Sequence, residues 1–127
     1  MATVFTNVGK AFASNKFANG NNTATAKYIG WGTGAGTAAA TDTTLFTEDS
    51  TGGYARATGT QTQQTTSVSN DTYQVVGTLT AGASLTITNA GVFDATTAGN
   101  MTLKADHTGI PLLAGDSIQY TFKLQFS

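Results

Sequence analysis

The stretch Ile118-Gln-Tyr-Thr-Phe-Lys-Leu-Gln-Phe126 decides the fold, because a large apolar residue occupies every second position. Successive side chains of a β-strand point to opposite faces, so one face of this segment is apolar and the other carries Gln, Thr and Lys. An apolar face of this size has to pack against a second layer, whereas the polar face can meet water. The stretch therefore predicts a strand that covers one side of a β-sheet core.

Other segments show the same two-residue period. In Thr72–Thr80, Tyr73, Val75, Gly77 and Leu79 share one face, and the apolar residues of 101–105 also alternate. Further strands are expected at residues 27–31, 43–47, 84–88 and 91–94, and over 54–68 with a break near Gly59. Short strands separated by turn residues predict an all-β fold, an antiparallel β-sandwich or jelly-roll-like single domain over residues 1–127.

Residues 7–19 form the one plausible helix. Asn7 suits an N-cap, Val8, Ala11 and Phe12 lie on one helical face, and Asn19-Gly20 is a stop signal. Residues 1–6 are expected to be an N-terminal arm in which Val4 and Phe5 reach a partner protein or a neighbouring subunit. Removing residues 1–6 should then leave a folded domain.

Composition excludes several classes of function. Charged residues make up 10% of the chain, against roughly 25% in an average soluble protein. The net charge of −1 with six Lys and Arg does not suit a nucleic-acid partner, and no apolar run approaches a membrane span. With no cysteine and only His107, the sequence predicts no catalytic site, no metal and no cofactor.

The candidate chemical motifs favour structural roles. Glycines alternate from Gly30 to Gly36 without the Lys or the spacing of a phosphate-binding loop, so we expect a structural loop. Asp106 and His107 are adjacent and would point to opposite faces of a strand, so they would not share a catalytic site. The acidic residues Asp42, Glu48 and Asp49 have the wrong spacing for calcium, and a solvated turn or an intersubunit salt bridge to Arg56 is preferred.

Aromatic residues leave two interpretations open. Trp31, Tyr28 and Tyr54 could stack on the sugar rings of a bound glycan. The preferred alternative makes Trp31 a core or interface anchor. The predicted interface set consists of Val4, Phe5, Trp31, Tyr54 and Arg56.

The order of several short motifs resembles a known group of proteins. Each motif is weak alone, and together they span nearly the whole chain: Thr6-Asn-Val-Gly-Lys10, Tyr28-Ile-Gly-Trp-Gly-Thr33, Thr43-Thr-Leu-Phe-Thr-Glu48 with Arg56, Asn70-Asp-Thr-Tyr-Gln-Val75, Ile87-Thr-Asn-Ala-Gly-Val-Phe-Asp94 and Ala114-Gly-Asp-Ser-Ile-Gln119. This order resembles small head-decoration (cement) proteins of tailed phages. It is also similar to the N-terminal attachment domains of tail-collar fibres, although those are normally followed by a long fibre and this chain stops at Ser127.

The resemblance implies a virion structural protein that binds the outside of a tailed-phage capsid and stabilises the shell. Its partners would be the major capsid protein and further copies of itself, most simply as a homotrimer. The composition agrees, because a surface with few charges and a single proline, Pro111, leaves sheet edges unprotected unless other subunits cover them. The alternative from the same resemblance is a tail fibre or attachment module that binds a host receptor or glycan.

Overall fold

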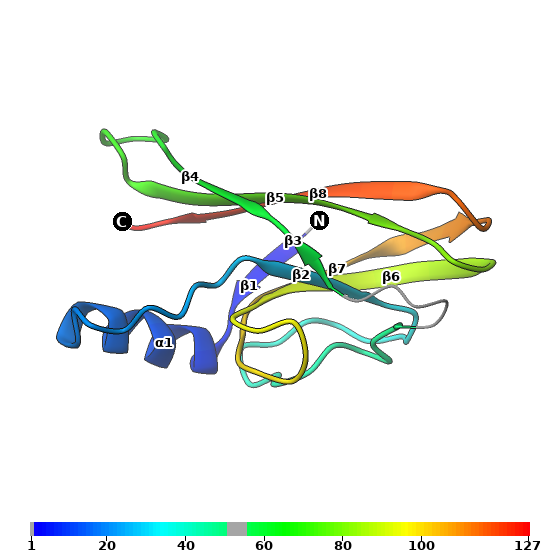
Figure 1. The fold of residues 1–127 in the computed structure, drawn as a ribbon, viewed down its shortest axis with the longest axis horizontal. Helices are drawn as coiled ribbons and strands as arrows, with labels where there is room; N and C mark the ends of the chain where they lie inside the picture. The colour runs from blue at the N-terminus through cyan, green and yellow to red at the C-terminus, as the bar shows by residue number, and fades with distance from the viewer. Residues whose placement is uncertain (1, 51–55) are drawn as a thin grey trace.

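Two antiparallel sheets face each other and enclose the main core (Figure 1). The computed structural model describes residues 2–50 and 56–127. Sheet A has the order β1-β7-β6-β2-β3, and sheet B has the order β4-β5-β8. The elements are β1 (Ala2–Phe5), α1 (Asn7–Ala18), β2 (Tyr28–Gly32), β3 (Ala57–Thr58), β4 (Thr60–Gln64), β5 (Thr72–Thr80), β6 (Leu85–Phe93), β7 (Met101–Leu112) and β8 (Ser117–Gln125). The predicted all-β sandwich with one N-terminal helix is confirmed.

The alternating segments pack as their period predicts. Strands β5 and β8 pair along their full length, with Val75 opposite Phe122 and Gly77 opposite Tyr120. Val75 and Phe122 are fully buried. The main core joins both sheets and comprises Ala26, Ile29, Trp31, Val75, Leu79, Ala81, Ile87, Ala90, Val92, Leu103, Ala105, Leu112, Tyr120 and Phe122. Burial of these apolar side chains is the main stabilising contribution to the sandwich.

One side of the sandwich is closed by a segment that changes sheets. Strand β3 pairs with β2 in sheet A, and β4 pairs with β5 in sheet B, with only Gly59 between them. The Gly59 amide donates to the Lys27 carbonyl, and a Cβ there would lie 2.5 Å from a methyl of Val75. The predicted break near Gly59 is therefore confirmed, and glycine permits the close approach of the two sheets.

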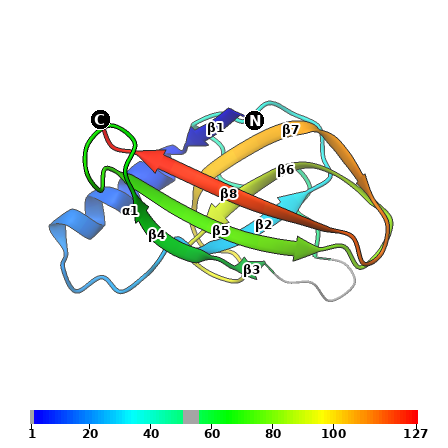
Figure 2. The ribbon, with the colours of Figure 1, turned by 90° about the horizontal axis from the view of Figure 1, so that it is seen from above.

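The opposite side has no comparable crossing. In the described residues β1 is an edge of sheet A and β8 is an edge of sheet B (Figure 2). A side-chain contact spans the gap, because His107 Nε2 lies 2.8 Å from the Tyr120 hydroxyl. Burial raises the pKa of that Tyr120 phenol above its usual value. The sandwich is thus closed by backbone on one side and by side chains on the other.

Within the expected arm at residues 1–6, Ala2–Phe5 form strand β1 and Thr6 caps the helix, so the expectation of an arm is wrong for these residues. Ala2–Phe5 pair in antiparallel register with 103–106 of β7. Phe5 packs against the main core, and Thr6 is fully buried. Thr3, Val4 and Phe5 are β-branched or aromatic residues that favour a strand. Pairing with the edge of β7 satisfies backbone hydrogen bonds that a free arm would leave to water.

The helix is confirmed, but its N-cap lies one residue earlier than predicted. Thr6, not Asn7, is the N-cap, and its hydroxyl accepts from the Gly9 amide at 2.9 Å. The same hydroxyl donates to the Met101 carbonyl at 2.5 Å, which joins the helix start to β7. Phe12 packs against the core as predicted, whereas Ala11 is exposed and Gly9 is the buried residue. A Cβ on Gly9 would lie 2.3 Å from the Thr102 carbonyl oxygen, so the helix contacts the sheet through its glycine.

Two strand predictions need correction. Residues 43–47 form a loop in which Thr47 has φ of 52°. The Asn89 side chain accepts from the Phe46 amide and donates to the Phe46 carbonyl, which also accepts from the Gly34 amide. Residues 84–88 and 91–94, expected as separate strands, lie mostly within one strand, β6, with a register shift between Ile87 and Asn89. A bulge keeps such a strand continuous while changing its direction.

Candidate functional site

Only part of the predicted interface set lies at the surface. Trp31 is 1% exposed and belongs to the main core, so the preferred core interpretation is confirmed and Trp31 cannot stack on a bound sugar. Val4 and Phe5 are half-buried in β1. Tyr54 lies outside the described residues. The structure therefore does not bring these residues together in one surface patch.

Arg56 holds loops of its own chain together. Its Nε and Nη2 donate to the two carboxylate oxygens of Glu48 at 2.7 and 2.9 Å, and its Nη1 donates to the carbonyls of Ala95 and Ala98 at 2.9 and 2.6 Å. The guanidinium carbon also lies 3.4 Å from the centre of the Phe93 ring. The Arg56 side chain is 6% exposed. The expected intersubunit salt bridge is therefore wrong: the bridge is intramolecular, with the bidentate geometry that favours arginine.

The glycine-rich loop packs on the face of sheet A that points away from sheet B. A Cβ on Gly32 would lie 2.4 Å from the Phe46 carbonyl oxygen, and one on Gly34 would lie 2.8 Å from the Phe46 carbonyl carbon. Asn89 is fully buried beneath this loop and bonds both backbone groups of Phe46 at 3.0 and 3.1 Å. The expectation of a structural loop is confirmed, because these glycines allow close backbone packing.

A buried lysine anchors the adjacent loop of residues 42–46. Lys104 is fully buried, and its ammonium donates to Asp42 Oδ2 and to the Thr44 carbonyl, both at 2.9 Å. It also lies 3.2 Å from the centre of the Phe46 ring. Burial opposes ionisation of Asp42, yet the hydrogen bonds from Lys104 and the Ala39 amide hold the Asp42 pKa below its usual value.

The Asp106–His107 pair does not form a catalytic arrangement. Asp106 Oδ1 accepts from the Ala38 amide at 3.0 Å, while His107 contacts the Thr108 carbonyl and the Tyr120 hydroxyl. The two side chains have separate partners, as predicted for neighbours on a strand. Among residues 2–50 and 56–127, no three His, Cys, Asp or Glu side chains gather as metal ligands would. In the same part of the chain, no helix has the length and apolar character needed to cross a membrane.

An apolar groove lies between α1 and sheet B. Sheet B extends beyond the end of sheet A and overhangs the helix (Figure 1). The groove has a volume of about 320 Å³ and is lined by Phe5, Gly9, Phe12, Ala13, Lys16, Phe17, Thr25, Ala26, Gln61, Tyr73, Thr102, Leu103, Leu124 and Phe126. Sequence patterns do not reveal it, since its walls come from segments far apart in the chain.

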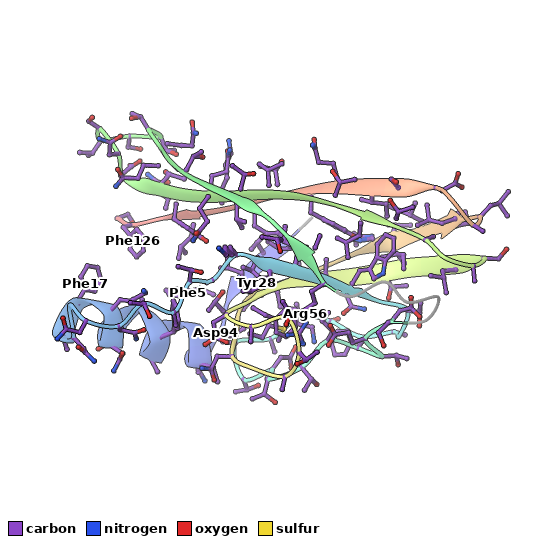
Figure 3. The ribbon with its side chains drawn as sticks, in the orientation of Figure 1. Phe5, Phe17, Tyr28, Arg56, Asp94 and Phe126 are labelled. Atoms are coloured by element: carbon purple, nitrogen blue, oxygen red, sulfur yellow. The ribbon has the colours of Figure 1, made fainter. Side chains whose placement is uncertain are left out.

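Aromatic side chains form the mouth of this groove. Phe17 projects from α1 and Phe126 projects from the end of β8 toward it, with Phe5 further in (Figure 3). Phe17 is 83% exposed and Phe126 is 48% exposed. Lys16 is the one charged residue of the lining, and its ammonium donates to the Asn22 carbonyl at 2.8 Å. Exposed aromatic residues around an apolar groove are typical of protein–protein contacts.

A second surface, the outer face of sheet B, is flat and mostly uncharged. Its outward side chains are Thr60, Thr62, Gln74, Val76, Thr78, Gln119, Thr121, Lys123 and Gln125. Figure 2 looks onto this face, and no other element of the described chain covers it. Such a face offers hydrogen bonds from amides and hydroxyls, with Lys123 as its single charge.

Comparison with known protein families gives one match. The family described as podophage GP4 fiber I protein gp80 matches residues 8–123. Neither a search of curated proteins nor a search of solved structures finds a match. The family match covers nearly all of the 127 residues, including α1 and every strand from β2 to β7 and most of β8. The chain therefore belongs to the podophage GP4 fiber I protein gp80 family and is a bacteriophage structural protein.

Proposed function

We propose that this protein is a non-catalytic building block of a podophage tail fibre. The observation that carries the proposal is the match of residues 8–123 to a podophage fiber family. The site geometry supports a structural role, because the charged groups inside the protein hold its own loops in place. Arg56 and Lys104 are both buried in intramolecular contacts, which leaves them occupied with folding rather than with a substrate.

Self-assembly is part of the proposal. A homo-oligomer, most simply a trimer, would cover the exposed aromatic groove and the free edges of β1 and β8. The unpaired edge of β8 runs over nine residues and carries Lys123 as its only charge, so in isolation it would invite edge-to-edge pairing. Repeated weak contacts between many copies can produce a stable assembly through avidity.

Capsid decoration is the second candidate function. The outer face of sheet B favours it, because a flat hydrogen-bonding surface suits a contact with the major capsid protein that depends little on salt. The receptor- or glycan-binding alternative loses its main residue, since Trp31 is buried. Residues Tyr28 and Tyr54 would remain for it, and Tyr28 packs against the small core of Leu45, Phe93 and Met101.

Cryo-electron microscopy of the virion tests the proposal directly. We expect density that fits this sandwich along the tail fibres, in several copies around the fibre axis. Density on the head surface, with none on the fibres, would replace the fibre assignment with capsid decoration. Gold-labelled antibody against the protein provides an independent localisation, and absence of label from intact, protein-containing virions at both positions would contradict both assignments.

A further inference from the structure

The exposed large hydrophobic side chains of the described residues gather mainly at the two ends of the molecule. Phe17 and Phe126 surround the apolar groove at one end. Ile110, near the end of β7, and Leu113, in the turn that follows, have 39% and 67% of their surface exposed. Residues 109–118 link β7 of sheet A to β8 of sheet B without pairing the two strands, and this connection is named the β7–β8 hairpin. Both views place this hairpin at the end of the molecule opposite α1 (Figures 1 and 2). One end of the protein is therefore concave and apolar, and the other projects and is apolar.

The hairpin is held rigidly in its projecting shape. Asp116 Oδ2 accepts from the Leu113 amide at 2.9 Å, and the Asp116 amide donates to the Leu113 carbonyl at 3.0 Å. The turn is also bonded to Ala81, which accepts from Gly115 at 2.8 Å and donates to the Asp116 carbonyl at 2.7 Å. Gly115 has φ of 93°, a conformation that suits glycine. A rigid projection loses little conformational entropy when it binds.

The helix wall of the groove and the hairpin carry opposite charges. Helix α1 carries Lys10 and Lys16 and no acidic residue, and Lys16 lines the groove. The hairpin residues 109–118 carry Asp116 and no basic residue. A contact between the two ends would place opposite charges near each other, whereas contact between two grooves would oppose lysines from both copies. Charge therefore favours a contact between the groove of one copy and the hairpin of another over a contact between two grooves.

We propose that the apolar groove receives the β7–β8 hairpin of a second copy of this chain. Leu113 and Ile110 enter the space between Phe17 and Phe126, and each copy offers one groove and one hairpin. This head-to-tail contact is heterologous, so repetition closes a ring or extends along an axis. The inference rests on the self-assembly part of the proposed function and names the surfaces that carry it.

Two complementary variants of the full chain test the contact. Leu113→Asp alters the hairpin, and the double variant Phe17→Gln/Phe126→Gln alters the groove. Val68→Asp is the matched control, since Val68 is 68% exposed and does not line the groove. Sedimentation measures association, and circular dichroism verifies the sandwich in each variant. Should either variant lose its fold, Leu113→Thr or Phe17→Gln alone takes its place.

We expect wild-type protein and Val68→Asp to associate equally, and each test variant to associate at least tenfold more weakly. An equimolar mixture of the two test variants retains one intact groove and one intact hairpin, so it should form a 1:1 dimer that neither variant forms alone. A mixture that remains monomeric would overturn the inference, as would variants that associate like wild type. In the second case self-assembly itself would stand, whereas a monomeric wild-type protein would contradict both.

Discussion

Asp42→Ala offers the sharpest stability test, because it leaves the fully buried ammonium of Lys104 without its carboxylate partner. Breaking a buried ion pair by removing one partner costs about 3–5 kcal/mol. Here the ammonium keeps the Thr44 carbonyl at 2.9 Å and the Phe46 ring at 3.2 Å. We therefore expect the free energy of unfolding to fall by about 3 kcal/mol, the lower end of this range. For a chain of this length that corresponds to a decrease in Tm of about 12 °C.

The reciprocal substitution should cost less. Lys104→Met removes the buried charge and keeps most of the side-chain volume, while Asp42 is 22% exposed and retains the Ala39 amide at 3.0 Å. We expect a loss of about 1–2 kcal/mol, from the unpaired Thr44 carbonyl. Lys123→Met on the outer face of sheet B is the matched control and should change stability by less than about 0.5 kcal/mol. Urea unfolding followed by tryptophan fluorescence measures all three.

The pH dependence provides a further check. The folded-state pKa of Asp42 lies below its unfolded value, so its contribution is fully present above the unfolded pKa and is lost as pH falls through the folded pKa. The unfolding free energies of wild type and Asp42→Ala should therefore differ most near neutral pH and converge below about pH 4. If Lys104→Met were more destabilising than Asp42→Ala, or if the difference did not decrease in acid, the account of this buried pair would be refuted.

Three further predictions concern backbone packing and are checked by thermal unfolding. Gly32→Ala should lower the free energy of unfolding by about 2 kcal/mol or more, since its Cβ would meet the Phe46 carbonyl oxygen. Gly20→Ala, with open space around it, should leave Tm within about 2 °C of wild type. Equal effects of the two substitutions would contradict the packing argument. Thr6→Val should cost about 2 kcal/mol, because it removes both the helix cap and the bond to β7, and an unchanged Tm would show that neither bond matters. Deleting residues 1–6 should destabilise the domain and accelerate hydrogen exchange at 103–106 of β7, and a deletion variant that unfolds like wild type would restore the arm interpretation.

Alternation within one segment was sufficient to predict the sheet layers. Thr72–Thr80 is a strand with the predicted bounds, and Val75 and Leu79 are buried on its predicted face. The loop at 43–47 has the composition of a strand, yet the side chain of Asn89, more than 40 residues away in sequence, bonds the amide and carbonyl of Phe46. Propensity cannot anticipate such a distant competitor.

The sequence did not predict the individual charged contacts or the groove, because both are formed by residues that only tertiary packing brings together. Lys104 lies at an outward position between Leu103 and Ala105, where the two-residue period predicts exposure. The loop of residues 42–46 packs over that face of sheet A, so Lys104 is buried and needs Asp42 as a partner. The prediction that Arg56 pairs with the acidic cluster is correct. The predicted bridge was between subunits, whereas Arg56 binds Glu48 of its own chain. The groove has walls from both sheets and the helix, and no local period reports such a surface.

The crossing at Gly59 gives the two sheets unequal freedom to separate. Along the β3–β4 side the two sheets share one continuous backbone. Separating them there would require breaking the hydrogen bonds of β3 to β2 or of β4 to β5. Along the β1–β8 side, the His107–Tyr120 contact is the hydrogen bond that spans the gap in the described residues. We therefore expect the two sheets to separate more easily along the edges of β1 and β8 than along the side closed at Gly59. Sub-global opening of this kind would expose the inner face of β8 before the inner faces of β2, β5 and β6.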